Sequence, residues 1–286
     1  MSRLRRAFRM MPRLAAHIIL SSDKTTGETT SHLTRLPKND SLVIGYSHST
    51  RLIKNISQIA GYVLCLLSSV SAFAAPPDSV RATYDIYKNG LKVEVKESYT
   101  RDKDRYALSS VWVPVGLLAL AKPEKIFIDS SGLIGKQGLR PLRFDHRREL
   151  DKNRSSHAEF DWAGKQLILT HHAQRTVVAL PDGTQDRLSA MYQFMFLPLQ
   201  KAVTLDFPMT NGSKLDTYRY TVKHNQPLKV PAGEFKTIYL YSQAKPGERR
   251  TEIWLATQHH NLPCKMTVTE ANGDQLTQVL SKLEVR

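Results

Sequence analysis

The amino-acid sequence predicts a mainly β protein with a single antiparallel sheet, strongly curved into a half-barrel or a barrel-like form. Turn dipeptides containing glycine recur between short runs of β-forming residues, which is typical of an antiparallel meander. Asn-Gly and Asp-Gly favour two-residue hairpin turns because both central residues need positive φ. These dipeptides are Asn89-Gly90, Ser131-Gly132, Ala163-Gly164, Asp182-Gly183, Asn211-Gly212, Ala232-Gly233 and Asn272-Gly273.

Alternation within the runs supports the same fold class. Residues 156–162 and 218–222 place apolar side chains on one face of a strand and polar side chains on the other. Such strands bury one face and leave the other in water. Residues 235–241 are apolar or aromatic on both faces, which predicts a central or covered strand.

One segment, residues 185–197, follows a helical period instead. Leu188, Met191, Tyr192 and Met195 have the i, i+3, i+4, i+7 spacing of an amphipathic helix. We expect this helix to pack on the concave face of the sheet.

The ends of this helix carry recognisable signals. Thr184 is the expected N-cap and Pro198 ends the run. A shorter apolar run at 115–121 predicts a short helix or a covering loop.

The region before residue 75 has the composition of a targeting segment. Residues 51–74 combine a positive flank, an apolar core at 59–67 and an Ala-x-Ala ending, the three parts of a secretory signal peptide. The apolar core is shorter than the roughly 20 residues that span a bilayer. We therefore expect export to the periplasm, a single β-rich domain at 75–286, and no stable transmembrane anchor after cleavage.

Residues 1–50 are basic, rich in Ser and Thr, and without sustained periodicity. We expect them to be disordered and to lie outside the fold. They are either an extended targeting region or the product of a gene start placed too early, with initiation near residue 51.

The formal net charge of +15 overstates the charge of the working protein. The first 74 residues hold ten Lys and Arg against three Asp and Glu, which leaves +8 on residues 75–286. The basic stretch 145–154 lacks interleaved aromatic residues for base stacking, and export removes most nucleic-acid partners. We expect no nucleic-acid binding and a solvated loop at 145–154; the alternative is contact with anionic lipid headgroups or lipopolysaccharide.

No catalytic residues, metal site or cofactor are predicted. The sequence has no Gly-x-Ser-x-Gly elbow and no glycine-rich phosphate loop. In a strand the two rings of His171-His172, or of His259-His260, would point to opposite faces, whereas zinc needs three or four converging ligands. We therefore expect these histidines to be solvated and to lie in turns. Cys264 is expected to be buried. We therefore expect the protein not to be an enzyme.

Aromatic side chains gather on the predicted strands and on the predicted helix. They either fill the core, or they leave an apolar groove between sheet and helix of the kind that binds small molecules. The groove hypothesis assigns ligand binding to Tyr192, Phe194, Met195, Phe196 and Trp254.

Several segments, spread over most of residues 80–285, form a recognisable set. They are YDIYKNGL at 84–91, GLRP at 138–141, DRLSAMYQF at 186–194, VPAGEF at 230–235, RTEIWLA at 250–256 and LP at 262–263. Together they resemble a family of exported bacterial proteins, domain-of-unknown-function family 3108. The resemblance implies an exported β-rich protein and brings no activity or site residues with it.

The C-terminal pattern of a Trp-bearing strand, a Leu-Pro step and a further strand is also similar to the tail of periplasmic lipoprotein carriers. That likeness implies a half-barrel sheet with helices on its concave face, and it concerns architecture alone.

These observations predict an exported periplasmic protein of the cell envelope that binds an apolar or lipid-like ligand, or an envelope component, without catalysis. The alternative is a structural or assembly factor that contacts an envelope protein through a sheet edge or an apolar surface and has no ligand pocket.

Overall fold

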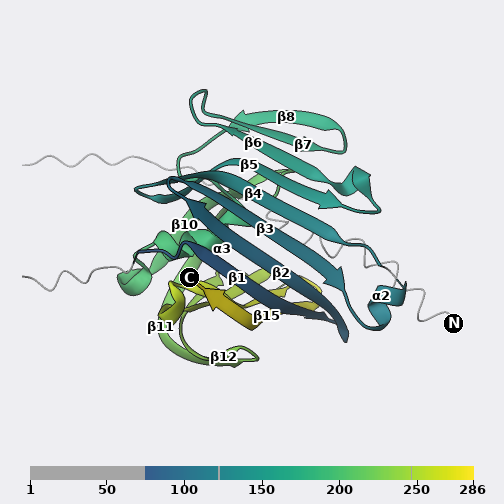
Figure 1. Cartoon of the computed structure of the whole chain (residues 1–286), viewed down its shortest axis with the longest axis vertical. Helices are drawn as coiled ribbons and strands as arrows, with labels where there is room; N and C mark the ends of the chain where they lie inside the picture. The colour runs from purple at the N-terminus through teal and green to yellow at the C-terminus, as the bar shows by residue number, and fades with distance from the viewer. Residues whose placement is uncertain (1–74, 122, 246) are drawn as a thin grey trace, which may run out of the picture. The chain divides into compact units, whose positions relative to one another are not determined.

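The computed structural model describes residues 75–121, 123–245 and 247–286 (Figure 1). The predicted signal peptide at 51–74 and the predicted disordered extension at 1–50 lie outside the described residues. Strands dominate the described part of the chain, and no helix there is long and apolar enough to cross a bilayer.

The strands of the described residues form one 15-stranded sheet, which confirms the mainly β, largely antiparallel fold. In chain order the strands are β1 (Ser79–Lys88), β2 (Leu91–Asp102), β3 (Arg105–Pro114), β4 (Ile126–Gly135), β5 (Gly138–Arg148), β6 (Ser156–Asp161), β7 (Gln166–His171), β8 (Gln174–Ala179), β9 (Gln185–Asp186), β10 (Thr204–Thr210), β11 (Leu215–Val230), β12 (Gly233–Ser242), β13 (Arg250–Ala256), β14 (Leu262–Thr269) and β15 (Gln275–Val285).

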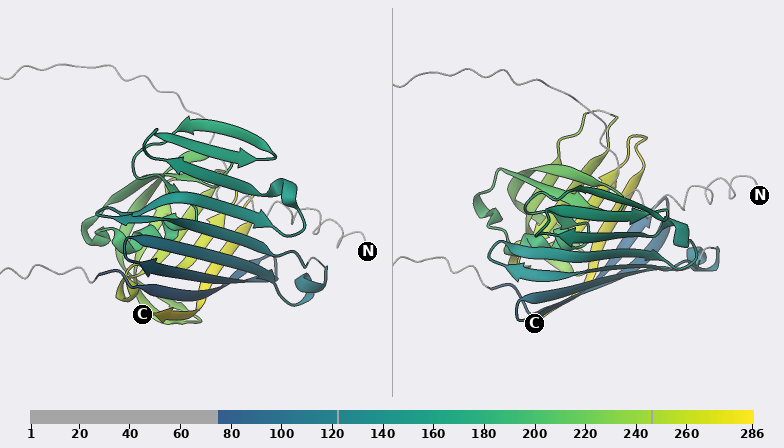
Figure 2. Two further views of the ribbon diagram at one scale, coloured as in Figure 1. Left: turned by 45° about the horizontal axis from the view of Figure 1, so that its top comes forward. Right: turned by 90° about the horizontal axis from the view of Figure 1, so that it is seen from above.

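Two meanders joined in the middle make up this sheet. Strands β8 to β1 lie in reverse chain order and are followed by β15 to β9, so that β1 and β15 connect the two halves. Figure 2 shows the first-half strands in front of those of the second half. The sheet is not closed, because β8 and β9 stand at the two ends of the order. The short pair β9 and β10 is parallel.

Most of the predicted turns connect strands, and one does not. Asn89 and Gly90 join β1 to β2 with φ angles of 51° and 75°, as a type I′ turn requires. Ser131-Gly132 instead lies inside β4 at a register shift against β5. A Cβ on Gly132 would stand 2.2 Å from the carbonyl oxygen of Arg140, so this glycine permits close approach of two strands at a bulge.

The predicted helix over 185–197 is shorter than expected and begins later. The structure has α3 (Ser189–Gln193) followed by the 3-10 turn η4 (Phe194–Phe196), and these eight residues are called the helical segment below. Gln185 and Asp186 are extended because they pair with Met209 and Thr210 of β10. Thr184 does not cap the helix; its hydroxyl donates a hydrogen bond to the carbonyl of Pro181. The apolar run at 115–121 contains the short helix α2 (Leu117–Ala121).

A buried carboxylate starts the helical segment and ties it to the sheet. Asp186 Oδ1 accepts hydrogen bonds from the backbone N–H groups of Leu188 and Ser189, at 2.9 and 2.8 Å. Its Oδ2 accepts the hydroxyl of Ser130 on β4 at 2.6 Å, and Tyr106 of β3 lies 3.1 Å from the same hydroxyl. Asp186 therefore caps the segment from β9 and holds it against β4.

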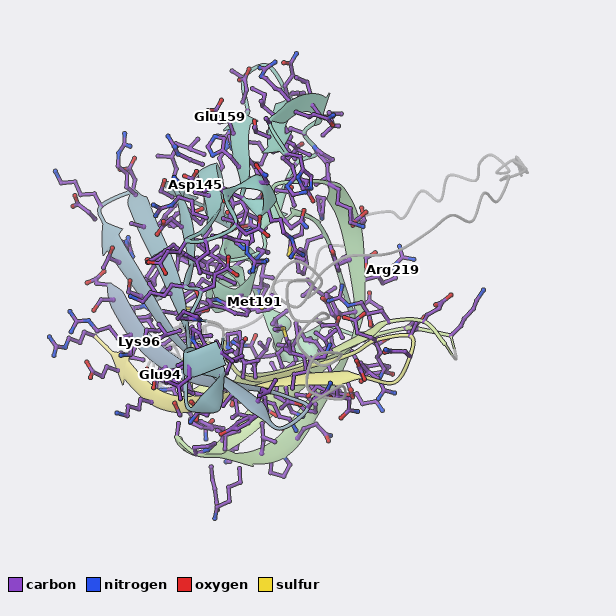
Figure 3. The ribbon with its side chains drawn as sticks, turned by 90° about the vertical axis from the view of Figure 1, so that its right-hand side faces the viewer. Glu94, Lys96, Asp145, Glu159, Met191 and Arg219 are labelled. Carbon is purple, nitrogen blue, oxygen red and sulfur yellow. The ribbon has the colours of Figure 1, made fainter. Side chains whose placement is uncertain are left out.

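The helical segment contacts strands from both halves of the sheet. Tyr192 donates a hydrogen bond to Glu97 of β2 at 3.1 Å, and α3 also contacts β5 and β14. The rings of Phe194 and Phe207, the latter on β10, meet edge to face with centroids 6.2 Å apart. Figure 3 shows Met191 of α3 toward the centre of the domain, whereas Arg219 lies toward its periphery.

The basic stretch 145–154 is a solvated loop only in its second part, residues 149–154, which lie between β5 and β6 and are exposed or half-buried. Its first four residues complete β5, and the alternation of that strand buries His146 and Arg148 while it exposes Arg147. Arg148 forms a buried ion pair with Glu124, and Arg147 pairs with Asp129 at 2.7 Å on the exposed side. Residues 145–148 thus belong to a strand, and Glu124 neutralises the buried charge of Arg148.

We expect Asp186→Ala to lower the free energy of unfolding by about 3 kcal/mol or more, because it leaves the Ser130 hydroxyl and two N–H groups buried without their acceptor. Urea denaturation measures this difference. Glu234→Ala is the control, because Glu234 pairs with Lys229 at the surface and should contribute about 1 kcal/mol or less. Equal losses in the two variants would show that the Asp186 network does not anchor the segment.

Candidate functional site

A cavity of about 410 Å³ lies beside the helical segment. This volume falls within the roughly 300–1,000 Å³ of small-molecule sites. The turn between β4 and β5, the helical segment, the chain that follows it and β10 contribute to the walls. The lining residues are Lys136, Gln137, Gly183, Gln185, Ala190, Gln193, Phe194, Phe196, Leu197, Pro198, Leu205, Asp206 and Phe207.

Apolar side chains make up much of the wall. Phe196 and Leu197 are half-buried at the end of the helical segment, and Leu205 and Phe207 are half-buried on β10. Phe194 is fully buried, so it supports the wall from behind through its contact with Phe207. Such a surface suits a hydrocarbon chain or another apolar group.

The polar groups of the cavity are mostly engaged by the protein itself. The Gln193 side chain accepts a hydrogen bond from the N–H of Leu139 and donates one to the carbonyl of Gln137, both at 2.7 Å. Asp206 pairs with Arg219 of β11 at 2.8 Å. Lys136 is exposed and has no ion pair with any described residue. A single uncompensated cation therefore borders an apolar cavity.

The structure divides the five predicted ligand-binding residues among three places. Phe194 and Phe196 belong to the cavity, whereas Tyr192 and Met195 are core residues outside its lining. Trp254 of β13 lies on the opposite face of its strand from the buried Ile253 and Leu255.

Two cavity residues on β10, Leu205 and Phe207, were not among the predicted ligand-binding residues. Their alternation with polar neighbours in Thr204–Thr210 predicts that they share one face of a strand. The sequence holds no signal that this face meets residues 194–198, because the contact depends on the tertiary path after Pro198.

A buried polar network lies on the other side of the helical segment. Glu97 accepts hydrogen bonds from Ser110 and from Tyr192, each at 3.1 Å, and Arg187 lies close enough to stabilise its negative charge. Removal from water outweighs these effects and raises the pKa of Glu97 to about 7. Burial likewise lowers the pKa of Arg187 to about 10. This network holds the helical segment to β2 and is separate from the cavity lining.

His146 of β5 is kept neutral. Burial, together with the positive charges of Arg187 and Arg148, lowers its pKa to about 2. A histidine in this state does not titrate near neutral pH and contributes no charge to the interior.

Within the described part of the chain, no three His, Cys, Asp or Glu side chains come together as a metal site would need. His172 lies exposed in the turn after β7 with a φ of 50°, as expected of a turn histidine. His171 is the last residue of β7, and the centroids of the two rings lie 3.9 Å apart. Cys264 is buried as predicted, and burial raises the pKa of its thiol to about 12, which leaves it unreactive.

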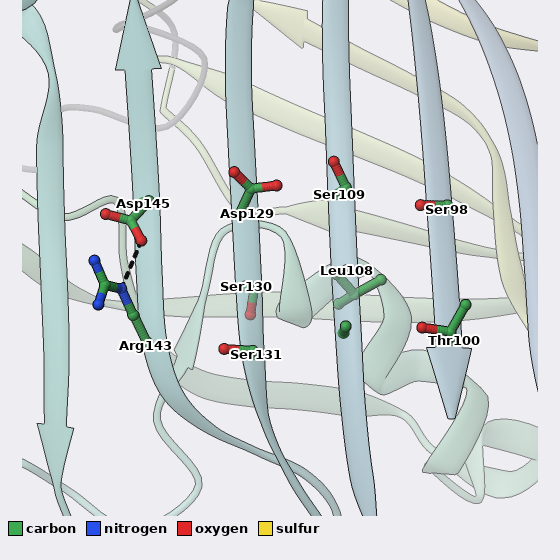
Figure 4. Close-up of a pocket in the computed structure, with 10 residues that line it drawn as sticks. Ser98, Thr100, Leu108, Ser109, Asp129, Ser130, Ser131, Arg143 and Asp145 are labelled. Carbon is green, nitrogen blue, oxygen red and sulfur yellow. Dashed lines mark hydrogen bonds and ion pairs between the residues drawn. The ribbon is translucent and has the colours of Figure 1, made fainter. Parts of the chain in front are cut away.

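A second hollow, of about 230 Å³, lies on the outer face of β2 to β5 (Figure 4). Small hydroxyl side chains and charged groups surround it, and on its β5 side the Arg143 guanidinium donates a hydrogen bond to Asp145 at 2.8 Å. This lining does not suit an apolar ligand. The residues are Ser98, Thr100, Ala107, Leu108, Ser109, Asp129, Ser130, Ser131, Arg143 and Asp145.

The raised pKa of Glu97 makes its contribution to stability depend on pH. Between the ordinary value of 4.5 and about 7, the folded state binds a proton that the unfolded state has lost, so stability falls as pH rises through this window. We expect Glu97→Gln to remove that fall and to gain up to about 3 kcal/mol over the wild type on going from pH 4 to pH 8. Urea denaturation of both proteins at the two pH values measures the difference, and an unchanged difference would contradict the assignment.

Comparison with known proteins identifies a family and gives no activity. No curated protein matches the sequence. Similar solved structures include a β-barrel-like protein of domain of unknown function DUF1849 from Brucella abortus, and a protein described as exported, with a YmcC-like fold, from Bacteroides fragilis. The first is 10% identical, covers 74% of this chain and 99% of that one, and has a TM-score of 0.48. The second is 11% identical, covers 73% and 96%, and has a TM-score of 0.30.

The model of the family described as "Protein of unknown function (DUF3108)" matches residues 83–281. The match covers well over half of the sequence and confirms the resemblance drawn from the separate segments. The chain therefore belongs to the DUF3108 family.

Proposed function

We propose that this protein is an exported, periplasmic binding protein for an apolar or lipid-like ligand, which it holds without catalysis in the cavity beside the helical segment. The observation that carries the proposal is the cavity itself, with Phe196, Leu197, Leu205 and Phe207 among its lining residues. Burying a ligand's hydrocarbon there is favourable by roughly 25 cal/mol for each Å² removed from water.

The fold supports this proposal through the placement of the helical segment. In the proposed architecture the sheet is strongly curved and the segment occupies its concave side. Contacts from Tyr192 to β2 and from Phe194 to β10 belong to opposite halves of the sheet, as that arrangement requires. A segment held from two sides gives the cavity a rigid wall.

The cation at the edge of the cavity indicates that the ligand carries an acidic group. Lys136 is exposed at the turn between β4 and β5, with no described carboxylate to compensate it. An ammonium group in that position attracts a carboxylate or phosphate. An amphiphile, with an acyl chain among the phenylalanines and an acidic head beside Lys136, fits both features.

The alternative function, an assembly or interaction factor, rests on the edge strand β8. Every residue of Gln174–Ala179 except Val178 is exposed, and Val177 has 44% of its surface in water. An edge with free backbone groups and exposed valine can pair with an extended segment of another envelope protein. This function does not need the cavity.

We expect Leu205→Trp to fill part of the cavity and to weaken binding of the fluorescent apolar probe 1-N-phenylnaphthylamine by about tenfold or more. Leu228→Trp is the matched control, because Leu228 is also a half-buried leucine on a strand but does not line the cavity. Mass spectrometry of the protein purified from cells should detect a co-purifying amphiphile in the wild type and in Leu228→Trp alone. Absence of probe binding and of any co-purified molecule in the wild type would overturn the proposal.

The proposed export predicts where the N-terminus of the mature protein lies. Edman sequencing of the protein recovered from the periplasm should give an N-terminus near Ala75, because the Ala-x-Ala arrangement ends at Ala74. Recovery of the protein with residues 51–74 still attached would contradict cleavage.

A further inference from the structure

An aromatic and cationic patch lies on the outer face of the second half of the sheet. Lys223 of β11 stands opposite Tyr239 of β12, Tyr239 opposite Trp254 of β13, and Trp254 opposite Lys265 of β14. Tyr241 follows Tyr239 on the same face of β12. These five residues are called the Lys-aromatic patch. The cavity does not use any of them, although the sequence singles out Trp254.

The three rings of the patch form one rigid group. The ring centroids of Tyr239 and Tyr241 are 5.4 Å apart, and those of Tyr239 and Trp254 are 4.8 Å apart. All three side chains remain half-buried, which leaves part of each ring in contact with water. A partly exposed aromatic cluster on the outer face of a sheet is a candidate interaction surface.

Each lysine of the patch lies over a ring and keeps its charge uncompensated. The ammonium group of Lys265 is 4.6 Å from the ring centroid of Trp254, and that of Lys223 is 5.1 Å from that of Tyr241. A cation–π contact orients an ammonium without neutralising it. Neither lysine forms an ion pair with a carboxylate in the part of the chain that the structure describes.

The carboxylate nearest in the strand register is already engaged. Glu252 lies on β13 opposite Tyr241, accepts a hydrogen bond from the hydroxyl of Tyr239, and pairs with Arg250 at 3.2 Å. The patch therefore presents two oriented positive charges on strands three apart, about 14 Å from each other at the usual strand spacing.

We propose that the Lys-aromatic patch docks the protein on a bilayer surface that carries anionic lipid headgroups. Tyrosine, tryptophan and lysine are the side chains that suit the membrane–water interface, because each joins an apolar body to a polar or charged end. The uncompensated lysines and the charge of +8 on residues 75–286 complement an anionic surface. This proposal goes beyond ligand binding in the cavity and does not depend on it.

Vesicle co-sedimentation tests the docking. Wild-type protein should bind vesicles of phosphatidylcholine and phosphatidylglycerol (3:1), bind pure phosphatidylcholine vesicles much less, and dissociate as salt is added. The double substitution Lys223→Glu and Lys265→Glu should weaken binding to the anionic vesicles by at least about tenfold. No binding of the wild type to anionic vesicles would overturn the proposal.

A matched control separates the patch from overall charge. Lys125→Glu with Lys165→Glu makes the same change of charge at two exposed lysines of the first half of the sheet. If this control weakens binding as much as the patch variant does, net charge alone explains the binding and the patch is not the docking site. Urea denaturation with midpoints close to that of the wild type shows that each variant is folded, and this control does not depend on ligand binding in the cavity.

Quenching of tryptophan fluorescence tests whether the rings of the patch contact lipid. Brominated lipids quench tryptophan fluorescence at short range, so vesicles that contain them should quench the wild type more than Trp254→Phe. Equal quenching of the two proteins would show that Trp254 does not reach the bilayer and would overturn the proposed orientation.

Discussion

The carboxylate of Asp186 is the interaction on which the arrangement of this domain depends. It is fully buried, and its two oxygen atoms accept three hydrogen bonds from Leu188, Ser189 and Ser130. Burial raises the pKa of Asp186, because the charged carboxylate is less stable away from water. The hydrogen bonds that it accepts offset part of this cost and fix the geometry around it. One side chain thus ends β9, begins the helical segment and connects that segment to β4.

The position of the cavity follows from this connection. Asp186 holds the start of the segment, and the hydrogen bond from Tyr192 to Glu97 holds its middle. The position of the segment on the sheet is therefore fixed, and the segment does not shift to fill the space of the cavity. The chain leaves the segment at Leu197 with an extended backbone, and β10 then returns past it. The apolar surfaces of Phe196 and Phe207 enclose a space that neither the segment nor the strand fills.

Features that depend on neighbouring residues were predicted correctly from the sequence, and features that depend on contacts far along the chain were not. Hairpins such as the one at Asn89-Gly90, and the alternation in strands such as β6, are local properties, and both were confirmed. The helix at 185–197 was wrong at its start because pairing of Gln185 and Asp186 with β10, a contact made far along the chain, overrides the helical period. Of the five predicted site residues, Phe194 and Phe196 belong to the cavity, and helical spacing alone does not distinguish them from Tyr192.

The two faces of the sheet meet different physical demands. In β13 the inward Ile253 and Leu255 belong to the core, while the outward Trp254 carries a lysine over its ring. The two-residue period of a strand separates these roles within three consecutive positions. The apolar ligand and the anionic surface of the two proposals would therefore be recognised by side chains on opposite faces of the same sheet. Taken together, the two proposals would give the lipid-like ligand a source, because the Lys-aromatic patch would place the protein on the membrane layer in which such a ligand dissolves.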